Sequence, residues 1–112
     1  GAGSANGFDQ MRVYPNPFKP GGANPNEGRP CSQNACAAGQ GITFDNLPVD
    51  VSLTIYDLLG TEIDTMRTFN SGGVMRWDGR NRNGADAPSG GYYAVIESPG
   101  RKIVVWKLAI IR

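Results

Sequence analysis

The sequence predicts an all-β fold made of about seven short antiparallel strands. The segment 51–57 alternates strictly between apolar and polar residues, which is the pattern of a half-buried strand. Sixteen glycines and eight prolines in 112 residues favour short strands joined by many turns. No stretch of ten or more residues has the 3.6-residue apolar period of a helix, so no helix is expected. Strands at roughly ten-residue spacing in a chain of this length are typical of an immunoglobulin-like (Ig-like) β-sandwich.

The individual strands follow from local patterns. Pro15 and Pro17 restrict φ and are expected to stop the first strand from being extended by another chain. Ile42 and Phe44 predict a short strand, followed by a turn at 45–48. In 61–69 the apolar residues do not share one parity, so this segment is expected to contain a bulge or to form an edge strand. Further strands are expected at 74–77, 92–98 and 102–111, with a tight hairpin at 99–101.

One domain is expected over residues 11–112, with a loop insertion at 17–41 that carries both cysteines. Residues 1–10 are interpreted as a linker or tag. This segment has neither a basic region nor an apolar region, so it is not expected to be a signal peptide.

Cys31 and Cys36 are separated by four residues, and a local disulfide is the first interpretation. Free thiols are the second, and metal or redox chemistry is the third, because the sequence contains no histidine and no third cysteine to complete a zinc site. Closing so short a loop contributes about 2 kcal/mol on the chain-entropy model. A disulfide would indicate an oxidising compartment.

The composition argues against several classes of function. Without histidine the usual catalytic triads and metal sites cannot form, and the carboxylates are scattered singly, so the chain is not expected to be an enzyme or to hold a cofactor or a small-molecule substrate. Its formal net charge of +1 gives no basis for nucleic-acid binding. No apolar run approaches the ~20 residues of a membrane-spanning helix, and membrane insertion is therefore not expected.

The segment 78–86 places Asp and Asn residues around glycine, as calcium loops do. Aligned with an EF-hand with Gly84 in the sixth position, however, the first and twelfth positions are both glycine, so no metal is expected. The segment is interpreted as a turn in which Asp78, Asn81 and Asn83 accept hydrogen bonds from the backbone, with Gly84, like Gly60, in a turn conformation. Trp77, just before the turn, and Trp106 are expected in the core.

Several motifs in order resemble a known family: Val13-Tyr-Pro-Asn-Pro-Phe-Lys-Pro20, Leu53-Thr-Ile-Tyr-Asp-Leu-Leu-Gly60, Met75-Arg-Trp-Asp-Gly-Arg-Asn-Arg-Asn-Gly84, Ser89-Gly-Gly-Tyr-Tyr93 and Lys107-Leu-Ala-Ile-Ile-Arg112. From about residue 12 to residue 112, the chain is similar to the Ig-like domain of the flagellar hook-capping protein and to C-terminal sorting domains of the type IX secretion system. The cysteine-bearing insertion, and a last strand with few lysines, depart from the family pattern.

The resemblance implies a non-catalytic C-terminal module of a secreted bacterial protein, exported through the periplasm and located outside the cell or on its surface. Sorting to, or anchoring at, that surface is the first expectation, with secretion-machinery proteins as partners. A structural assembly module of an extracellular filament or a hook-cap type protein, with neighbouring subunits as partners, is the alternative. A carbohydrate-binding accessory domain would require Tyr56, Tyr92 and Tyr93 on one exposed face.

The two C-terminal strands, 92–98 and 102–112, are the expected site of partner recognition. The segment 102–112 is apolar on both parities, so one face packs in the core and part of the other needs cover. The alternative is a central strand that is buried on both sides. The residues assigned to recognition are Lys102, Val104, Trp106, Lys107 and Arg112.

Overall fold

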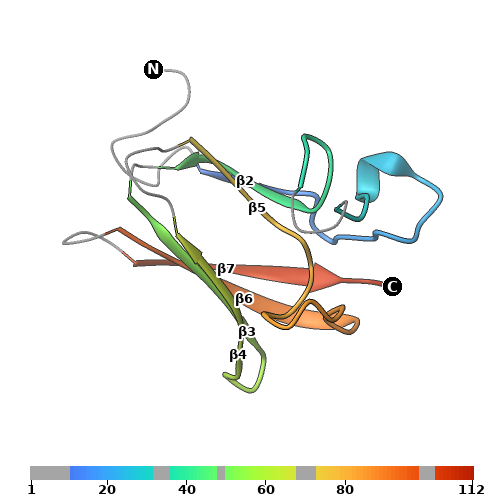
Figure 1. Cartoon of the computed structure of the whole chain (residues 1–112). Helices are drawn as coiled ribbons and strands as arrows, with labels where there is room; N and C mark the ends of the chain where they lie inside the picture. The colour runs from blue at the N-terminus through green and yellow to red at the C-terminus, as the bar shows by residue number, and fades with distance from the viewer. Residues whose placement is uncertain (1–10, 32–35, 48–49, 68–72, 99–102) are drawn as a thin grey trace.

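Two antiparallel sheets pack face to face in the computed structural model, which describes residues 11–31, 36–47, 50–67, 73–98 and 103–112 (Figure 1). The strands are β1 (Arg12–Tyr14), β2 (Ile42–Leu47), β3 (Ser52–Asp57), β4 (Glu62–Arg67), β5 (Gly73–Trp77), β6 (Gly90–Glu97) and β7 (Ile103–Ile110). Among the described residues, the helical structure consists of one short 3₁₀ turn, η1 (Pro25–Glu27). The predicted all-β fold is confirmed.

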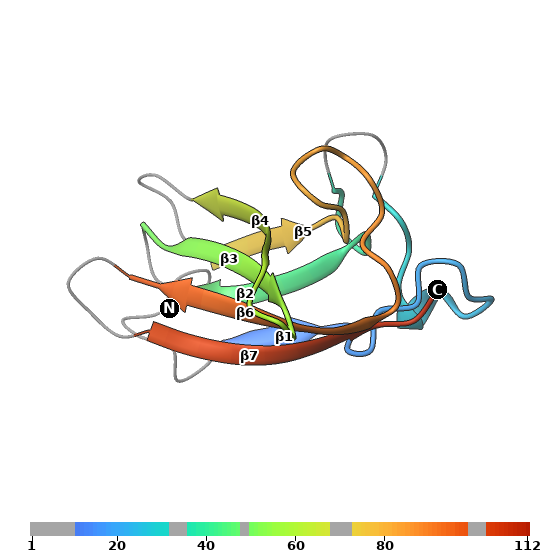
Figure 2. The ribbon, with the colours of Figure 1, turned by 90° about the horizontal axis from the view of Figure 1, so that it is seen from below.

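The strand order shows the Ig-like arrangement. One sheet has the order β1-β2-β5 and the other β4-β3-β6-β7. The pairs β2–β5 and β3–β6 join strands that are not consecutive in the chain, as Greek-key connections require. Seen from below, β1 and β7 lie along the same side of the sandwich, while β4 and β5 lie along the other (Figure 2).

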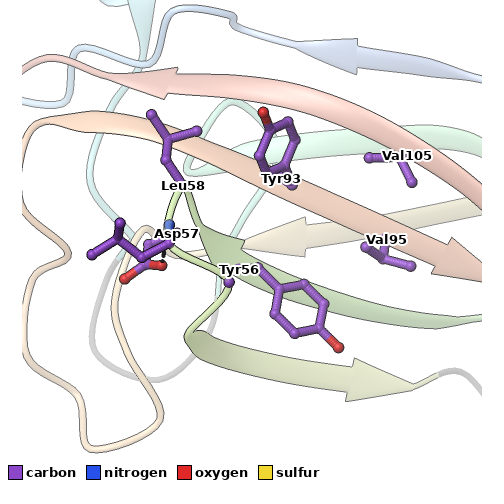
Figure 3. Close-up of a pocket in the computed structure, with 8 residues that line it drawn as sticks. Tyr56, Asp57, Leu58, Tyr93, Val95 and Val105 are labelled. Atoms are coloured by element: carbon purple, nitrogen blue, oxygen red, sulfur yellow. Dashed lines mark hydrogen bonds between the residues drawn. The ribbon is translucent and has the colours of Figure 1, made fainter.

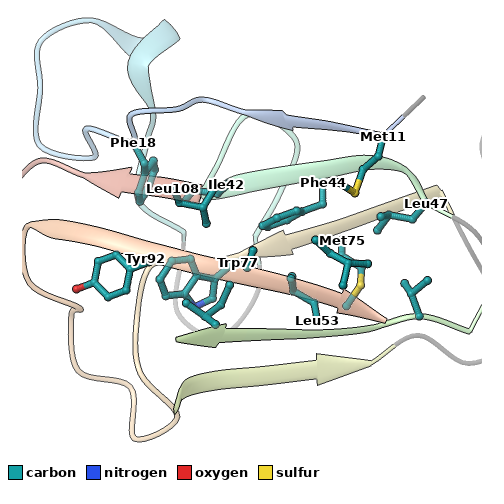
Figure 4. Close-up of a cluster of buried hydrophobic side chains, with 14 of the residues drawn as sticks. Met11, Phe18, Ile42, Phe44, Leu47, Leu53, Met75, Trp77, Tyr92 and Leu108 are labelled. Carbon is teal, nitrogen blue, oxygen red and sulfur yellow. The ribbon is translucent and has the colours of Figure 1, made fainter. Parts of the chain in front are cut away.

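Alternate residues of both sheets fill the space between them (Figure 4). In β3, Leu53 and Ile55 point inward and are fully buried, so the alternation read from the sequence sets the inner face of this strand. Trp77 at the end of β5 is also fully buried, and its indole N–H donates to the carbonyl oxygen of Arg80 at 3.0 Å. Trp106 is partly buried against the same core.

Tyr92 lies inside the sandwich, near the start of β6. Its ring meets Trp77 edge-to-face with 5.8 Å between centroids, and its hydroxyl donates to the carbonyl oxygen of Pro88 at 2.5 Å. A tyrosine that bonds back to the chain four residues upstream at this point is the tyrosine corner of Ig-like domains. The exposed strip that a carbohydrate-binding domain would require of Tyr56, Tyr92 and Tyr93 therefore does not form, because Tyr92 faces the core.

The turn predicted at 45–48 is wrong in its first part. β2 continues to Leu47, which is buried and pairs with Gly73 of β5, and the register shifts between Phe44 and Leu47. Asn46 has φ 54°, a conformation that asparagine tolerates, so the turn-like residues form a bulge within the strand. Burial of Leu47 favours the strand over the turn.

The irregular segment at 61–69 is both bulged and at an edge. β4 is the outer strand of its sheet, and its register with β3 shifts between Ile55 and Tyr56. The predicted strands at 74–77, 92–98 and 102–111 agree with β5, β6 and β7 to within two residues at each end. The hairpin predicted at 99–101 lies outside the described residues.

Candidate protein-interaction surface

The outer side of the four-stranded sheet is unusually apolar. Alternation in β3, β6 and β7 places one set of residues there, and the turn after β3 adds two leucines. We call this set the outer apolar face: Tyr56, Leu58, Leu59, Tyr93, Val95, Ile103 and Val105. Most of its members line one shallow hollow of about 430 Å³ (Figure 3). Ile103 and Val105 are 59% and 58% exposed, which is rare for β-branched residues two apart on one strand.

The turn between β3 and β4 holds its leucines in place. The carboxylate of Asp57 accepts hydrogen bonds from the backbone N–H groups of Leu59 and Thr61, both at 2.9 Å. Gly60 has φ 88° and donates to the carbonyl oxygen of Asp57 at 3.1 Å. This turn is therefore fixed by its own hydrogen bonds, and it presents Leu59 with 92% of its surface exposed.

Leu58 folds back over β6. A Cβ at Gly91 would lie 3.1–3.3 Å from three carbon atoms of the Leu58 side chain, so the glycine leaves the space that this leucine uses. Leu58 is nevertheless 54% exposed and lies beside Tyr93 (Figure 3). The turn and the sheet thus form one continuous apolar surface.

The free edge of β7 is covered along its second half. The side chain of Asn16 donates to the carbonyl oxygen of Lys107 at 3.0 Å and accepts from the N–H of Ala109 at 3.2 Å, so its amide replaces a peptide group of a neighbouring strand. Phe18 forms a parallel bridge to Ile110. The N–H of Phe18 donates to the carbonyl oxygen of Ala109, and its carbonyl oxygen accepts from the N–H of Ile111. The chain after β1 has therefore changed sheets to pair with β7.

The first half of the same edge is open. Within the described ranges, the hydrogen bonds to this side of β7 come from Asn16 and Phe18 and reach no further than Lys107. Among the described residues, no strand therefore pairs with Ile103 to Trp106 on this side, next to the outer apolar face. β7 is an edge strand, and the alternative of a strand buried on both sides is wrong.

The structure separates the residues assigned to recognition. Val104 and Trp106 are turned inward and partly buried against the core, so the apolar residues of β7 that face solvent are their neighbours Ile103 and Val105. Lys107 is exposed, beside Tyr93 on the outer side of the sheet. Lys102 lies outside the described residues.

Arg112 is engaged within the molecule instead of being free for a partner. Its guanidinium donates to the carbonyl oxygens of Ala87 at 2.6 Å and Gly79 at 2.7 Å, and its backbone N–H donates to the Ser89 hydroxyl at 2.8 Å. Asp86 lies 3.9 Å from the same guanidinium. These bonds fasten the end of β7 to the loop between β5 and β6.

That loop is organised by its own side chains. Asp78 accepts from the N–H of Arg80 at 3.0 Å, and Asn81 accepts from the N–H groups of Asn83 and Ala85 at 2.9 and 3.0 Å. Gly84 has φ 85°, and its N–H donates to the carbonyl oxygen of Asn81. Across the described part of the chain, no group of three or more acidic, cysteine or histidine side chains is placed to hold a metal ion.

Cys31 and Cys36 form a disulfide, with their Cα atoms 4.6 Å apart. It packs on Gly41, where a Cβ would lie 2.4 Å from the carbonyl oxygen of Trp77 and 2.8 Å from Sγ of Cys31. The disulfide therefore fixes the loop insertion against the end of β5. The described residues contain no helix that is long and apolar enough to cross a membrane.

Solved structures that share this fold include PorZ and PorU. PorZ of Porphyromonas gingivalis, described as an essential bacterial surface component of the type IX secretion system, matches 100% of this chain with a TM-score of 0.70 and 26% identity. This chain resembles one part of PorZ. It covers 13% of the PorZ chain, so the resemblance concerns a single region of a much longer protein.

The second structure is dimeric latent PorU from the same organism, which matches 90% of this chain and 9% of its own length with a TM-score of 0.55 and 20% identity. At that identity PorU shows the fold alone. No protein-family model and no curated protein sequence matches the chain. Of the two sides of the resemblance described above, the type IX side is supported and the flagellar hook-capping side is not.

Sequence reasoning did not identify most of the outer apolar face. Leu58 and Leu59 appeared within a family motif, and Tyr56 and Tyr93 were considered for carbohydrate, but Val95, Ile103 and Val105 were not singled out. The parity of β7 was the missing information. Pairing of 92–98 with 102–111 about the short hairpin would have placed Val105 opposite Val95, on the same side as Tyr93.

Proposed function

We propose that this chain is a non-catalytic Ig-like module of a cell-surface protein of the type IX secretion system, and that it acts in sorting or anchoring by binding another protein. The observation that carries the proposal is the outer apolar face, which lies on a rigid sheet in a fold similar to part of PorZ. Exposed apolar patches of this kind mark protein-interaction sites.

Two further observations support this setting. The Cys31–Cys36 disulfide is typical of oxidising compartments, which fits an exported protein. The sequence has no histidine, and the carboxylates of Asp57 and Asp78 hold turns, which fits a module that binds and does not catalyse.

A delivery experiment tests the proposal. The whole chain is fused to the C-terminus of a periplasmic reporter in a host with type IX secretion, and surface-exposed reporter is measured. We expect delivery of the wild-type fusion, and a several-fold loss in the double variant Leu59→Ser/Val105→Ser, because truncation of exposed contact residues weakens an interface without opening the core.

Val74→Ser is the matched control, since Val74 is 45% exposed but lies on the other sheet. This variant is expected to be delivered like the wild type. If the wild-type fusion stays in the periplasm, the sorting function is wrong and a structural assembly module takes its place. If the double variant is delivered as well as the wild type, the outer apolar face has no part in delivery.

A further inference from the structure

The open stretch of β7 differs from the other sheet edges in the described residues. β1 has three residues and is followed directly by Pro15, β4 carries Glu62 and Asp64, and β5 carries Arg76. Natural proteins protect sheet edges by shortness, proline and charge. Ile103 to Trp106 have none of these protections, and the four residues are all apolar.

The hydrogen bonds of Ala109 and Lys107 show to which side the N–H and C=O groups of Ile103 and Val105 point. Ala109 uses both its N–H and its carbonyl oxygen on the edge side, and Lys107 uses its carbonyl oxygen there. Because alternate residues of an antiparallel strand direct both groups to the same side, Ile103 and Val105 direct theirs to the open edge as well. The edge thus offers two donors and two acceptors, together with the N–H of Lys107.

The same edge already accepts an added segment. Asn16 and Phe18 pair with Lys107 to Ile111 although about ninety residues separate them in the chain. A further strand placed on Ile103 to Lys107 would continue this row of hydrogen bonds from the point where Asn16 ends it. Its side chains on the outer side would extend the outer apolar face.

We propose that a strand of a partner protein completes this edge, pairing antiparallel with Ile103–Lys107 and placing apolar residues opposite Ile103 and Val105 and an acidic residue opposite Lys107. The acidic residue is required for charge complementarity, because Lys107 is the exposed charged residue of Ile103–Lys107 and faces no described carboxylate. The proposal deepens the proposed function by naming the chemistry of the partner, and its test does not depend on secretion.

A second copy of this chain is a poorer occupant than such a strand. Two-fold pairing about Val105 would set Lys107 of each copy against the apolar Ile103 of the other, and it would call on the carbonyl oxygen of Lys107 that Asn16 already uses. Among the described residues, pairing about Val104 would engage Ile103 and Val105 alone. Neither arrangement gives Lys107 an acidic partner.

The test uses the whole chain and the labelled peptide acetyl-Thr-Glu-Thr-Val-Thr-Ile-Thr-amide, followed by fluorescence anisotropy. We expect saturable binding that weakens about two- to fivefold when the peptide glutamate is replaced by lysine, as for one exposed ion pair. Lys107→Glu should reverse this preference. Val105→Pro, which removes the outward N–H, should abolish binding, whereas Val105→Thr, which keeps it, should bind nearly as the wild type does.

Hydrogen exchange supplies a readout that needs no variant. The peptide should slow exchange of the N–H groups of Ile103, Val105 and Lys107 and leave those of Val104 and Trp106 unchanged, because the latter already pair with β6. Absence of saturable binding, or binding without this alternation, overturns the proposal. Alternating protection together with dimer formation in the absence of peptide would make a second copy the occupant, and would equally overturn it. Delivery of the reporter fusion despite a negative peptide result would leave the proposed function standing.

Discussion

Tyr92 and Tyr93 are neighbours in the sequence with opposite roles. Tyr92 points into the core, meets Trp77 and bonds the Pro88 carbonyl, while Tyr93 contributes to the outer apolar face. Burial raises the pKa of the Tyr92 phenol, which the charge of Arg112 partly offsets. One position of strand parity thus separates a core residue from a residue of the outer apolar face.

The hydroxyl of Tyr92 can be tested alone. Tyr92→Phe keeps the buried ring and removes the bond to Pro88, so the free energy of unfolding should fall by about 1 kcal/mol in urea denaturation. Tyr93→Phe, on the exposed side, should leave it unchanged. Equal effects of the two variants would show that the corner bond does not stabilise the fold.

Asp64 should make stability depend on pH. Burial, and to a lesser extent the negative charge of Asp78, raises the pKa of the Asp64 carboxyl. The folded state therefore holds this proton more tightly than the unfolded state, and stability is lost as pH rises from the ordinary aspartate pKa through the raised one.

Asp64→Asn removes that loss and retains an oxygen to accept the N–H of Thr65. The melting temperature of this variant should match the wild type near pH 3 and exceed it increasingly towards pH 7. Glu97→Gln, at an exposed carboxylate on β6, serves as the control. A difference that stays constant between pH 3 and 7 would contradict the assignment.

At the scale of elements, β7 is held by two unlike neighbours. β6 pairs along its whole length, whereas on the other side a single asparagine and a single phenylalanine bond its second half. Phe18 is fully buried, and its ring lies where Cβ atoms at Gly28 and Gly79 would clash or crowd. The Asn-Pro-Phe motif thus holds the second half of β7 in place through these hydrogen bonds and the burial of Phe18.

Asn16→Ala should free one backbone amide in particular. Without the side-chain oxygen, the N–H of Ala109 loses its acceptor, and its hydrogen exchange should accelerate. The N–H of Leu108 should keep its rate, because it pairs with β6. The exchange of Ala109 is the measurement, and an unchanged rate would mean that another group protects the edge.

The order of the strands could be predicted from the sequence, but their partners could not. Alternation in 51–57 depends on local residue types, and it correctly placed Leu53 and Ile55 inside. The second half of β2 was missed because Asp45 and Asn46 have the same preferences in a bulge as in a turn. For β7, apolar residues on both parities gave no sign of which side faced the core.

At the scale of the whole molecule, Trp77 is the largest fully buried side chain and joins the two sheets (Figure 4). Trp77→Ala should lower the free energy of unfolding by about 3–5 kcal/mol, because it opens a cavity and removes the hydrogen bond from the indole N–H to the Arg80 carbonyl oxygen. Trp106→Ala should cost less, since Trp106 is only partly buried. Urea denaturation measures both variants. A larger loss of unfolding free energy for Trp106→Ala than for Trp77→Ala would contradict the central place of Trp77 in the core.

The sequence predicts which strands carry the candidate surface, but not which of their residues form it. The last strand was expected to need cover, and within the described residues the first half of its edge is unpaired and Ile103 and Val105 on its outer side are exposed. The contributions of Leu58, which packs at Gly91, and of Asn16, which bonds β7, depend on contacts between segments far apart in the sequence. Neither a turn motif nor an isolated asparagine predicts such contacts.

The bonds from Asn16 and Phe18 to the end of β7 also determine when the fold can be completed. Residues 16–18 contact 107–111 across about ninety intervening residues. When the chain emerges from its N-terminal end, residues 16–18 therefore cannot pair until β7 has also emerged. Contacts of such separation form late, after the entropy of closing the long loop has been overcome. A chain interrupted before Lys107 would lack the strand that receives Asn16 and Phe18, so its two ends could not be joined. The architecture therefore requires that β7 be present before residues 16–18 can pair.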